Sequence, residues 1–382
     1  TGFGIPKEKA DQLVRHTLRV SKETLEESEE NGQVWVGPIQ GGEHLEIVRR
    51  STKSLINMGF EMMALGSPVE FMESYEYGLL AKMIMESKKH IPHHIPLHLF
   101  GAGHPLTVGF SVALGCDTFD SASYMLYAKH GRYITDDGTR RIEDIDVFPC
   151  NCKICLSYTP KELSQAEYQE RTNNIAIHNL YAIKNEVDHV RQAIFEGRLW
   201  EYVMKKARAH PRLYEIIEIF TNAGDYFTVS TPAFKEKAIF LFDGIDQFRP
   251  EVQNYRAIAA KFKSTKKKLV ITKTPKIKPA YLSQDYKTIK SKFKKDSAIQ
   301  FCQYSPHLGI IPIEISDIFP AAHHETARIN FDPRDYTAFG DALMQFLDNN
   351  KFTEIHYDSS DKFLRHFMKM VPAGTKKFKI KK

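Results

Sequence analysis

The sequence predicts an α/β protein in which parallel strands and crossover helices alternate through the first half of the chain. Two observations lead to this fold class. Short apolar runs alternate with stretches of helical periodicity over four units in about 120 residues. The strand-like runs also end in Gly, Gln or Asp, at the side of the sheet where barrel enzymes place their active sites. Such a sheet is either doubly wound or part of a (β/α)8 barrel, and since a closed barrel needs eight strands, four indicate the C-terminal half of one.

The elements of this first half follow one another in order. Residues 6–30 have helical spacing, with five apolar side chains near one face: Leu13, Val14, Leu18, Val20 and Leu25. Buried strands are then expected at four places: 33–40, 60–66, 95–103 and from Cys116 onward. Helical stretches separate them at 43–59, 69–89 and 105–115.

The second half changes in character. After His178 the chain is strongly helical, and from Ala238 strand-like runs alternate with lysine-rich connectors. We therefore expect a partial barrel at 1–204 with a metal-binding subdomain at about 148–180, a separate α/β accessory domain at 205–370, and a basic tail at 371–382.

Composition excludes two classes of protein. No run of eighteen apolar residues exists, so we expect no membrane-spanning helix. Three of the five cysteines lie within 150–155, which is no disulfide framework and favours a cytoplasmic, reducing location.

The net charge is +6, and the segment from Arg256 to Asp296 contains fourteen lysine or arginine side chains and two acidic ones. This segment either binds a polyanion or is only a solvated face.

A metal site is the most specific chemical signal. Cys150, Cys152, Cys155 and His178 offer three thiolates and an imidazole, a closed tetrahedral set for one Zn²⁺. Four protein ligands leave no position for water, so the ion would be structural, and His178 is expected in the first turn of a helix. The alternative is free buried cysteines with an unrelated surface histidine.

Polar residues at the strand ends are weaker candidates. Asp117 and Asp120 lie where a strand meets its loop, and a carboxylate there can attack the C1′ carbon of a nucleoside or simply cap the loop. The amide of Gln40 can read a base edge or cap a helix. The histidines of the 88–98 segment lack metal-ligand spacing and are interpreted as loop residues. Neither a GxGxxG motif nor a P-loop is present.

Several stretches together resemble the tRNA-guanine transglycosylases, above all their archaeal branch. They are HLFGAGHP, VALGCDTFDSASYMLYAKHGRYIT, FPCNCKIC and IAIHNLYAIKNEV, and the similarity continues to LGIIPIEISDIFPAAHHE, so that it covers most of the chain. The resemblance implies a (β/α)8 barrel that replaces a guanine in the D arm of tRNA with the base 7-cyano-7-deazaguanine, in archaeosine biosynthesis.

The resemblance also implies roles for individual residues. Asp120 would be the nucleophile that forms a covalent intermediate with tRNA, and Gln40 would bind the purine edge. The backbone at Gly66 and Ser67 would contact the base carbonyl, although the family usually has a second glycine in place of Ser67. Gly101 and Gly103 would leave room for the base, and one zinc ion would be bound per chain.

The chain departs from the family in what it lacks. The front half of the barrel with its general acid/base, a further base-reading aspartate and the C-terminal RNA-binding domain do not match any part of residues 1–382. We therefore expect a fragment, in preference to one half of a split enzyme or a degenerate subunit. The expected partners are tRNA, a deazaguanine base, and either a second copy or a complementary subunit. A non-catalytic tRNA-binding scaffold is the alternative. An archaeosine synthase paralogue is disfavoured because its Pro-Cys…Lys-Pro-Tyr signature is not seen.

Overall fold

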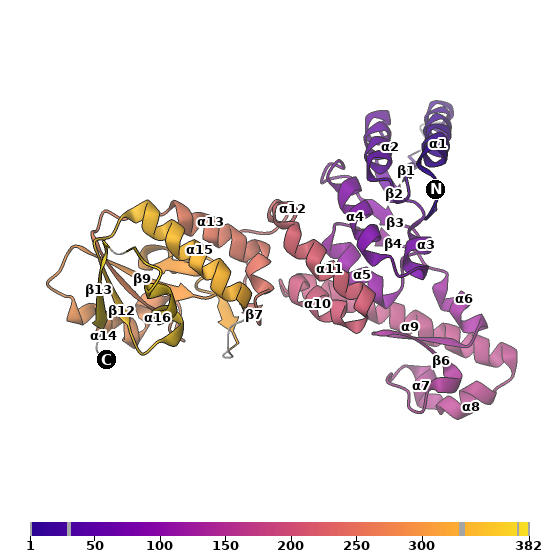
Figure 1. Cartoon of the computed structure of the whole chain (residues 1–382). Coiled ribbons are helices and arrows are strands. Elements are labelled where there is room, and N and C mark those ends of the chain that lie inside the picture. The colour runs from indigo at the N-terminus through magenta and orange to yellow at the C-terminus, as the bar shows by residue number, and fades with distance from the viewer. Residues whose placement is uncertain (1, 29–31, 328–332, 373, 381–382) are drawn as a thin grey trace. The chain divides into compact units, whose positions relative to one another are not determined.

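The computed structural model describes residues 2–28, 32–327, 333–372 and 374–380. The chain divides into two compact units, Thr1–Ile219 and Phe220–Lys382. Figure 1 shows the strands and helices of both, coloured along the chain. Each unit has its own sheet and its own buried apolar clusters, so each is described by itself.

A parallel sheet forms the centre of the first unit. Its four strands lie in sequential order and all pair in parallel: β1 (Val36–Ile39), β2 (Met62–Leu65), β3 (Leu97–Leu99) and β4 (Thr118–Phe119). The register sets Ile39 beside Leu65, Leu65 beside Leu99, and Leu99 beside Phe119. The last residues of all four strands therefore lie side by side, and whatever follows them gathers at one edge of the sheet.

Helices connect and cover these strands. They are α1 (Lys7–Glu27), α2 (Leu45–Met58), α3 (Pro68–Glu73), α4 (Tyr77–Lys88), α5 (Pro105–Ala113) and α6 (Ser123–Lys129). The second of them buries Ile47, Val48 and Leu55 on one face, as its 3.6-residue periodicity requires. It ends at Gly59, whose φ of 94° lies in the left-handed region that stops a helix.

A small subdomain packs against one long helix. The hairpin β5 (Arg132–Thr135) and β6 (Gly138–Arg141) is followed by η1 (Ile142–Asp144), α7 (Lys153–Ser157), α8 (Pro160–Gln165) and α9 (Tyr168–Phe195). In Figure 1, α7 and α8 lie alongside α9, and both contact it. Their shared apolar cluster includes Tyr133, Leu163 and Ile175. The unit then continues through α10 (Leu199–Lys206) and η2 (Ala207–Ala209) into α11 (Pro211–Asn222).

The second unit is built on a mixed five-stranded sheet of order β10-β9-β8-β12-β13. Its strands are β8 (Lys268–Lys273), β9 (Ile299–Ser305), β10 (Gly309–Pro312), β12 (Glu354–Asp358) and β13 (Lys376–Ile380), and β7 (Ile239–Leu241) pairs separately with β11 (His324–Thr326). The helical elements are α12 (Gly224–Thr228), η3 (Asp246–Phe248), α13 (Pro250–Lys261), η4 (Ala280–Leu282), α14 (Gln284–Lys292), η5 (Ile313–Ile315), α15 (Pro333–Asn350) and α16 (Lys362–Met368).

Alternation along the strands gives this sheet two different faces. Leu269 and Ile355 point into the large apolar cluster that α15 and α16 complete. On the other face Phe301 and His356 meet aromatic side chains of the α14 region, where the rings of Phe293 and His356 are 5.1 Å apart. The lysine-rich helix α14 therefore lies on the face opposite the main core.

The structure confirms an α/β protein with parallel strands and corrects some details. Leu13 and Val20 are 38% and 41% exposed, because α1 buries the stripe of Ala10, Val14 and Ser21 instead. The barrel half and the three domain assignments stay predictions. Of the expected tail 371–382, Lys376–Ile380 form β13. Among the described residues, no helix is long and apolar enough to cross a membrane.

Candidate functional site

Five residues predicted for the site lie within two positions after the ends of the four parallel strands. Gln40 comes after β1, Gly66 and Ser67 after β2, Gly101 after β3, and Asp120 after β4. Since the carboxyl ends of these strands are in register, the five residues share one edge of the sheet. This edge is where parallel α/β folds bind their ligands.

Asp120 presents an exposed carboxylate that is held at one oxygen. The backbone N–H of Gly101 donates to Oδ1 over 2.8 Å, and the ring Nε2 of His98 lies 3.1 Å from the same oxygen. The Asp120 side chain is 59% exposed, whereas that of His98 is only 15% exposed. A carboxylate placed in this way can reach a substrate, while His98 and the N–H of Gly101 fix its orientation.

His98 is the site residue that sequence reasoning missed. The loop interpretation of the 88–98 histidines is wrong for His98, which is the central residue of β3, within the strand expected at 95–103. Its neighbours Leu97 and Leu99 are fully buried. The alternation Leu-His-Leu was the available signal, because in a strand it points the ring to the side opposite the two leucines.

Asp117, the other strand-end aspartate, has a structural role. Its Oδ2 accepts a hydrogen bond from the backbone N–H of Leu97 at 2.8 Å and lies 3.4 Å from Nζ of Lys88. These contacts tie the start of β4 to the start of β3, at the edge of the sheet away from Asp120. The structure thereby gives different surroundings to two carboxylates that only the family resemblance distinguishes in the sequence.

The ends of β1 and β2 are in close contact. The N–H of Gly66 donates to the carbonyl of Ile39 over 2.9 Å, and a Cβ added at Gly66 would lie 3.4 Å from Cγ of Gln40. The backbone N–H of Gln40 bonds to Oγ of Ser51 at 3.2 Å, which fixes the turn into α2. Ser67 has a φ of 65°, in the left-handed region that favours glycine.

Gly101 and Gly103 are both packed against other side chains. A Cβ at Gly101, where φ is 65°, would overlap Val69, and one at Gly103 would overlap Ser121. Close packing thus accounts for both glycines, and at Gly101 the left-handed backbone is a second reason. Their predicted role of leaving room for a base stays a prediction.

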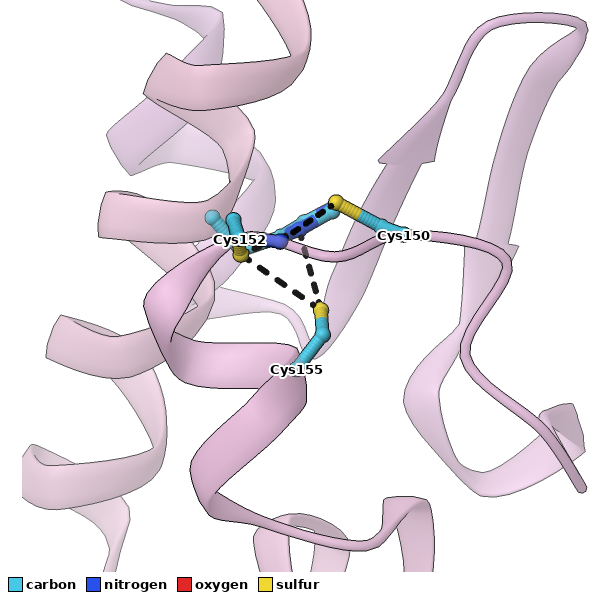
Figure 2. A group of neighbouring side chains, drawn as sticks. Cys150, Cys152 and Cys155 are labelled. Atoms are coloured by element: carbon cyan, nitrogen blue, oxygen red, sulfur yellow. Dashed lines mark hydrogen bonds between the residues drawn. The ribbon is translucent and has the colours of Figure 1, made fainter.

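The four predicted metal ligands form one cluster. Their ligand atoms all lie within 4.8 Å of one another, and Figure 2 shows the sulfurs of Cys150, Cys152 and Cys155 pointing toward one another. Sγ of Cys152 is 3.5 Å from Sγ of Cys155 and 3.5 Å from Nδ1 of His178. A tetrahedral zinc ion with bonds of about 2.3 Å to sulfur separates its sulfurs by roughly 3.8 Å, so the donor set fits Zn²⁺.

The contacts of His178 leave its ring nitrogen Nδ1 available to bind a metal. Nε2 donates to the carbonyl of Ile134 over 2.8 Å, which leaves Nδ1 with its lone pair toward the sulfurs. Burial lowers the pKa of His178 to about 4, so that the ring is neutral. The ring of Tyr133 stacks on the imidazole with centroids 3.6 Å apart, and its hydroxyl lies 3.1 Å from Sγ of Cys155.

The position of His178 within its helix differs from the prediction. It lies well inside α9, which begins at Tyr168, and not in a first turn. The helix starts early because Glu167 caps it, accepting hydrogen bonds from the N–H groups of Gln169 and Glu170. The cluster, which is compatible with a structural zinc site, therefore clamps the middle of a long helix to the cysteine loop.

Fold and site together define a class: a parallel α/β protein with a strand-end carboxylate and a closed three-cysteine, one-histidine cluster. More narrowly, the chain belongs to the queuine tRNA-ribosyltransferase family, whose model matches residues 1–212.

Three similar proteins come from archaea and share one name, tRNA-guanine(15) transglycosylase. The protein of Saccharolobus solfataricus is 36% identical over 365 residues, covering 94% of this chain and 72% of its own length. That of Sulfolobus acidocaldarius is 41% identical, covering 71% of this chain and 55% of its own length. That of Methanocaldococcus jannaschii is 36% identical, covering 84% and 48%. The chain thus spans between about half and three quarters of the relatives it matches.

Proposed function

We propose that this chain carries the nucleophile half of a tRNA-guanine transglycosylase, which replaces a D-arm guanine with 7-cyano-7-deazaguanine. The observation that carries the proposal is Asp120, exposed and held at Oδ1, on the same sheet edge as Gln40 and Gly66. The relatives' shared name, with its guanine at position 15, supports the substrate.

The sheet fits a (β/α)8 barrel better than a doubly wound fold. A doubly wound sheet reverses its strand order at a switch point, whereas a barrel keeps sequential order. Strands β1 to β4 are sequential and parallel. We infer that they form the C-terminal half of the barrel, and that the other half, from a longer chain or a complementary subunit, closes it.

The proposed reaction has two displacements at C1′ of the target nucleotide. The Asp120 carboxylate attacks C1′ as the bond from C1′ to guanine N9 breaks, and guanine leaves with the electron pair and takes a proton from a general acid. N9 of the incoming base then gives its proton to that group and attacks C1′, releasing the carboxylate. Two inversions retain the β-configuration. We place the general acid in the other half of the barrel.

Gln40 and the end of β2 would hold the base during these steps. The amide of Gln40 offers a donor and an acceptor to a purine edge, and the backbone at Gly66 and Ser67 lies next to it. Zinc, one ion per chain, would be held by Cys150, Cys152, Cys155 and His178, and supplies no chemistry to the exchange beyond rigidity. With four protein ligands it has no open position.

The tRNA would also contact the lysine-rich face of the second unit. Helix α14 has no buried residue, and its exposed lysines include Lys287 and Lys290. Contacts from such lysines to phosphates would position the RNA and add no base specificity.

The test is the incorporation of labelled guanine or 7-cyano-7-deazaguanine into unmodified tRNA. The chain is assayed alone and together with the segment of the Saccharolobus relative that this chain does not match. We expect incorporation in the combined assay, and a loss of about 10⁴-fold or more with Asp120→Asn. Asp188→Asn, an exposed carboxylate on α9 paired with Lys184, is the matched control and should retain activity.

Two results would overturn the proposal. Full activity of Asp120→Asn would remove this carboxylate from the chemistry. Binding of tRNA without exchange in every combination would favour the non-catalytic scaffold instead.

A further inference from the structure

We infer that His98 is a positioning residue, which together with Thr118 anchors one oxygen of Asp120 and leaves the other to attack. The inference rests on the proposed function and concerns how the nucleophile is aimed. No predicted role involved either residue.

The contacts form a short chain across two neighbouring strands. His98 on β3 and Thr118 on β4 are register partners, and Nδ1 of the ring lies 2.8 Å from Oγ1 of the threonine. Nε2 of the same ring lies 3.1 Å from Oδ1 of Asp120. The ring also packs edge-on against Phe100, with centroids 4.8 Å apart. The imidazole is thus held at both nitrogens and along one side.

These contacts define the tautomer of the ring. An ionised carboxylate only accepts hydrogen bonds, so Nε2 of His98 must carry the proton that it shares with Asp120. In a neutral imidazole Nδ1 is then an acceptor, and the Thr118 hydroxyl donates to it. The Asp120 carboxylate therefore selects the ring form, and Thr118 supports it by giving the bare Nδ1 a donor.

The two oxygens of Asp120 become unequal as a result. Oδ1 accepts from both His98 and the N–H of Gly101, whereas Oδ2 has no hydrogen bond within the described part of the chain. Two donors at Oδ1 fix the carboxylate plane without covering Oδ2. Oδ2 is accordingly the atom that forms the bond to C1′, and Oδ1 becomes the carbonyl oxygen of the ester while keeping both donors.

The kinetic test uses two substitutions of His98. His98→Phe keeps the packing against Phe100 but has no donor, and His98→Gln places an amide N–H near the position of Nε2. In the combined exchange assay, His98→Phe should lower kcat by about 10²-fold, the effect of a misaligned nucleophile, with little change in KM for tRNA. His98→Gln should recover most of that loss. The control is His94→Phe, in an exposed turn of the same segment, which should behave like the wild type.

Three results would overturn the inference: wild-type kcat in His98→Phe, an effect on KM alone, or equal losses in the Phe and Gln variants. If Asp120→Asn abolishes exchange while His98→Phe does not, the inference fails and the proposed function stands. If Asp120→Asn is fully active, the proposed function itself fails.

A second readout does not depend on activity. Two-bond ¹H–¹⁵N spectra of the chain itself should show His98 protonated at Nε2 and bare at Nδ1, and Thr118→Val should weaken that preference. A ring protonated at Nδ1 in the wild-type chain would contradict the inference.

Discussion

At the scale of single residues, the strand-end edge depends on backbone groups as much as on side chains. Gly101 supplies one of the two donors to Asp120, from a left-handed conformation and against the Val69 side chain. A side chain at this position would strain the backbone and move the donor.

Gly101→Ala should therefore lower both stability and activity. We expect a loss of about 1–3 kcal/mol in the free energy of unfolding, measured by urea titration, together with a reduced exchange rate. Gly224→Ala is the control, since a Cβ there has no neighbour within 4 Å. Equal stability of Gly101→Ala and the wild type would show that the packing described for this turn is incorrect.

At the scale of elements, the cysteine cluster fixes α9 through His178. Besides α9, the described elements of this subdomain are short: the β5–β6 hairpin and the helices α7 and α8. Burial raises the pKa of the Cys155 thiol, so that without a cation this thiol stays protonated and holds the helix weakly.

Chelation or Cys152→Ser should release one zinc ion per chain and loosen this subdomain. Hydrogen exchange should rise across 132–178, while the amides of β2 and β3 stay protected, because their hydrogen bonds do not involve the cluster. Cys116→Ala, a buried cysteine outside the cluster, should keep its zinc. Zinc retained after Cys152→Ser would argue against the four-ligand site.

Helix α14 allows a separate test of RNA binding. Replacing Lys287, Lys294 and Lys295 with Ala should flatten the slope of log affinity for tRNA against log salt by about 0.7 to 0.9 for each lysine that contacts a phosphate. Lys268 is left intact because it pairs with Asp296 and Glu354. The control pair is Lys362→Ala and Lys369→Ala, on and beside α16 across the sheet. An unchanged slope in this triple variant would remove α14 and the turn after it, with Lys294 and Lys295, from the interface.

At the scale of the whole molecule, each unit has its own determinants of stability. In the second unit Glu251 is buried between Arg249 and Lys235. Burial alone would raise the pKa of this carboxyl, but the two cations outweigh it and lower the pKa to about 2 from an ordinary value of 4.5.

The depressed pKa of Glu251 predicts how acid affects the stability of the second unit. Because the folded pKa is depressed, the contribution of Glu251 is fully present above about pH 4.5 and is lost as pH falls toward about 2. Glu251→Gln should cost about 3 kcal/mol at pH 7, because the buried Arg249 loses the carboxylate of Glu251, and the gap to wild type should close in acid. Thermal unfolding at several pH values measures both, and a gap that is constant with pH would contradict the assignment.

Local signals in the sequence predicted much of this molecule. Glycine and aspartate at strand ends located the edge of the sheet, and the spacing of Cys150, Cys152 and Cys155 located the metal cluster. The role of His98 could not be predicted as readily, since its partner Asp120 comes from another strand. The early start of α9 could not be predicted because its first turns are polar and exposed. Strand β13 could not be predicted because it lies in a lysine-rich segment and pairs through its backbone.

The central claim is that Asp120 forms a covalent bond to tRNA, and its most direct test is to map that bond. The chain, combined with the segment of the Saccharolobus relative that it does not match, is mixed with tRNA in the absence of free base, denatured and digested. Mass spectrometry should then find the nucleotide on the peptide that contains Asp120, with no adduct in Asp120→Asn. An adduct on another residue, or exchange that proceeds without any adduct, would contradict the account.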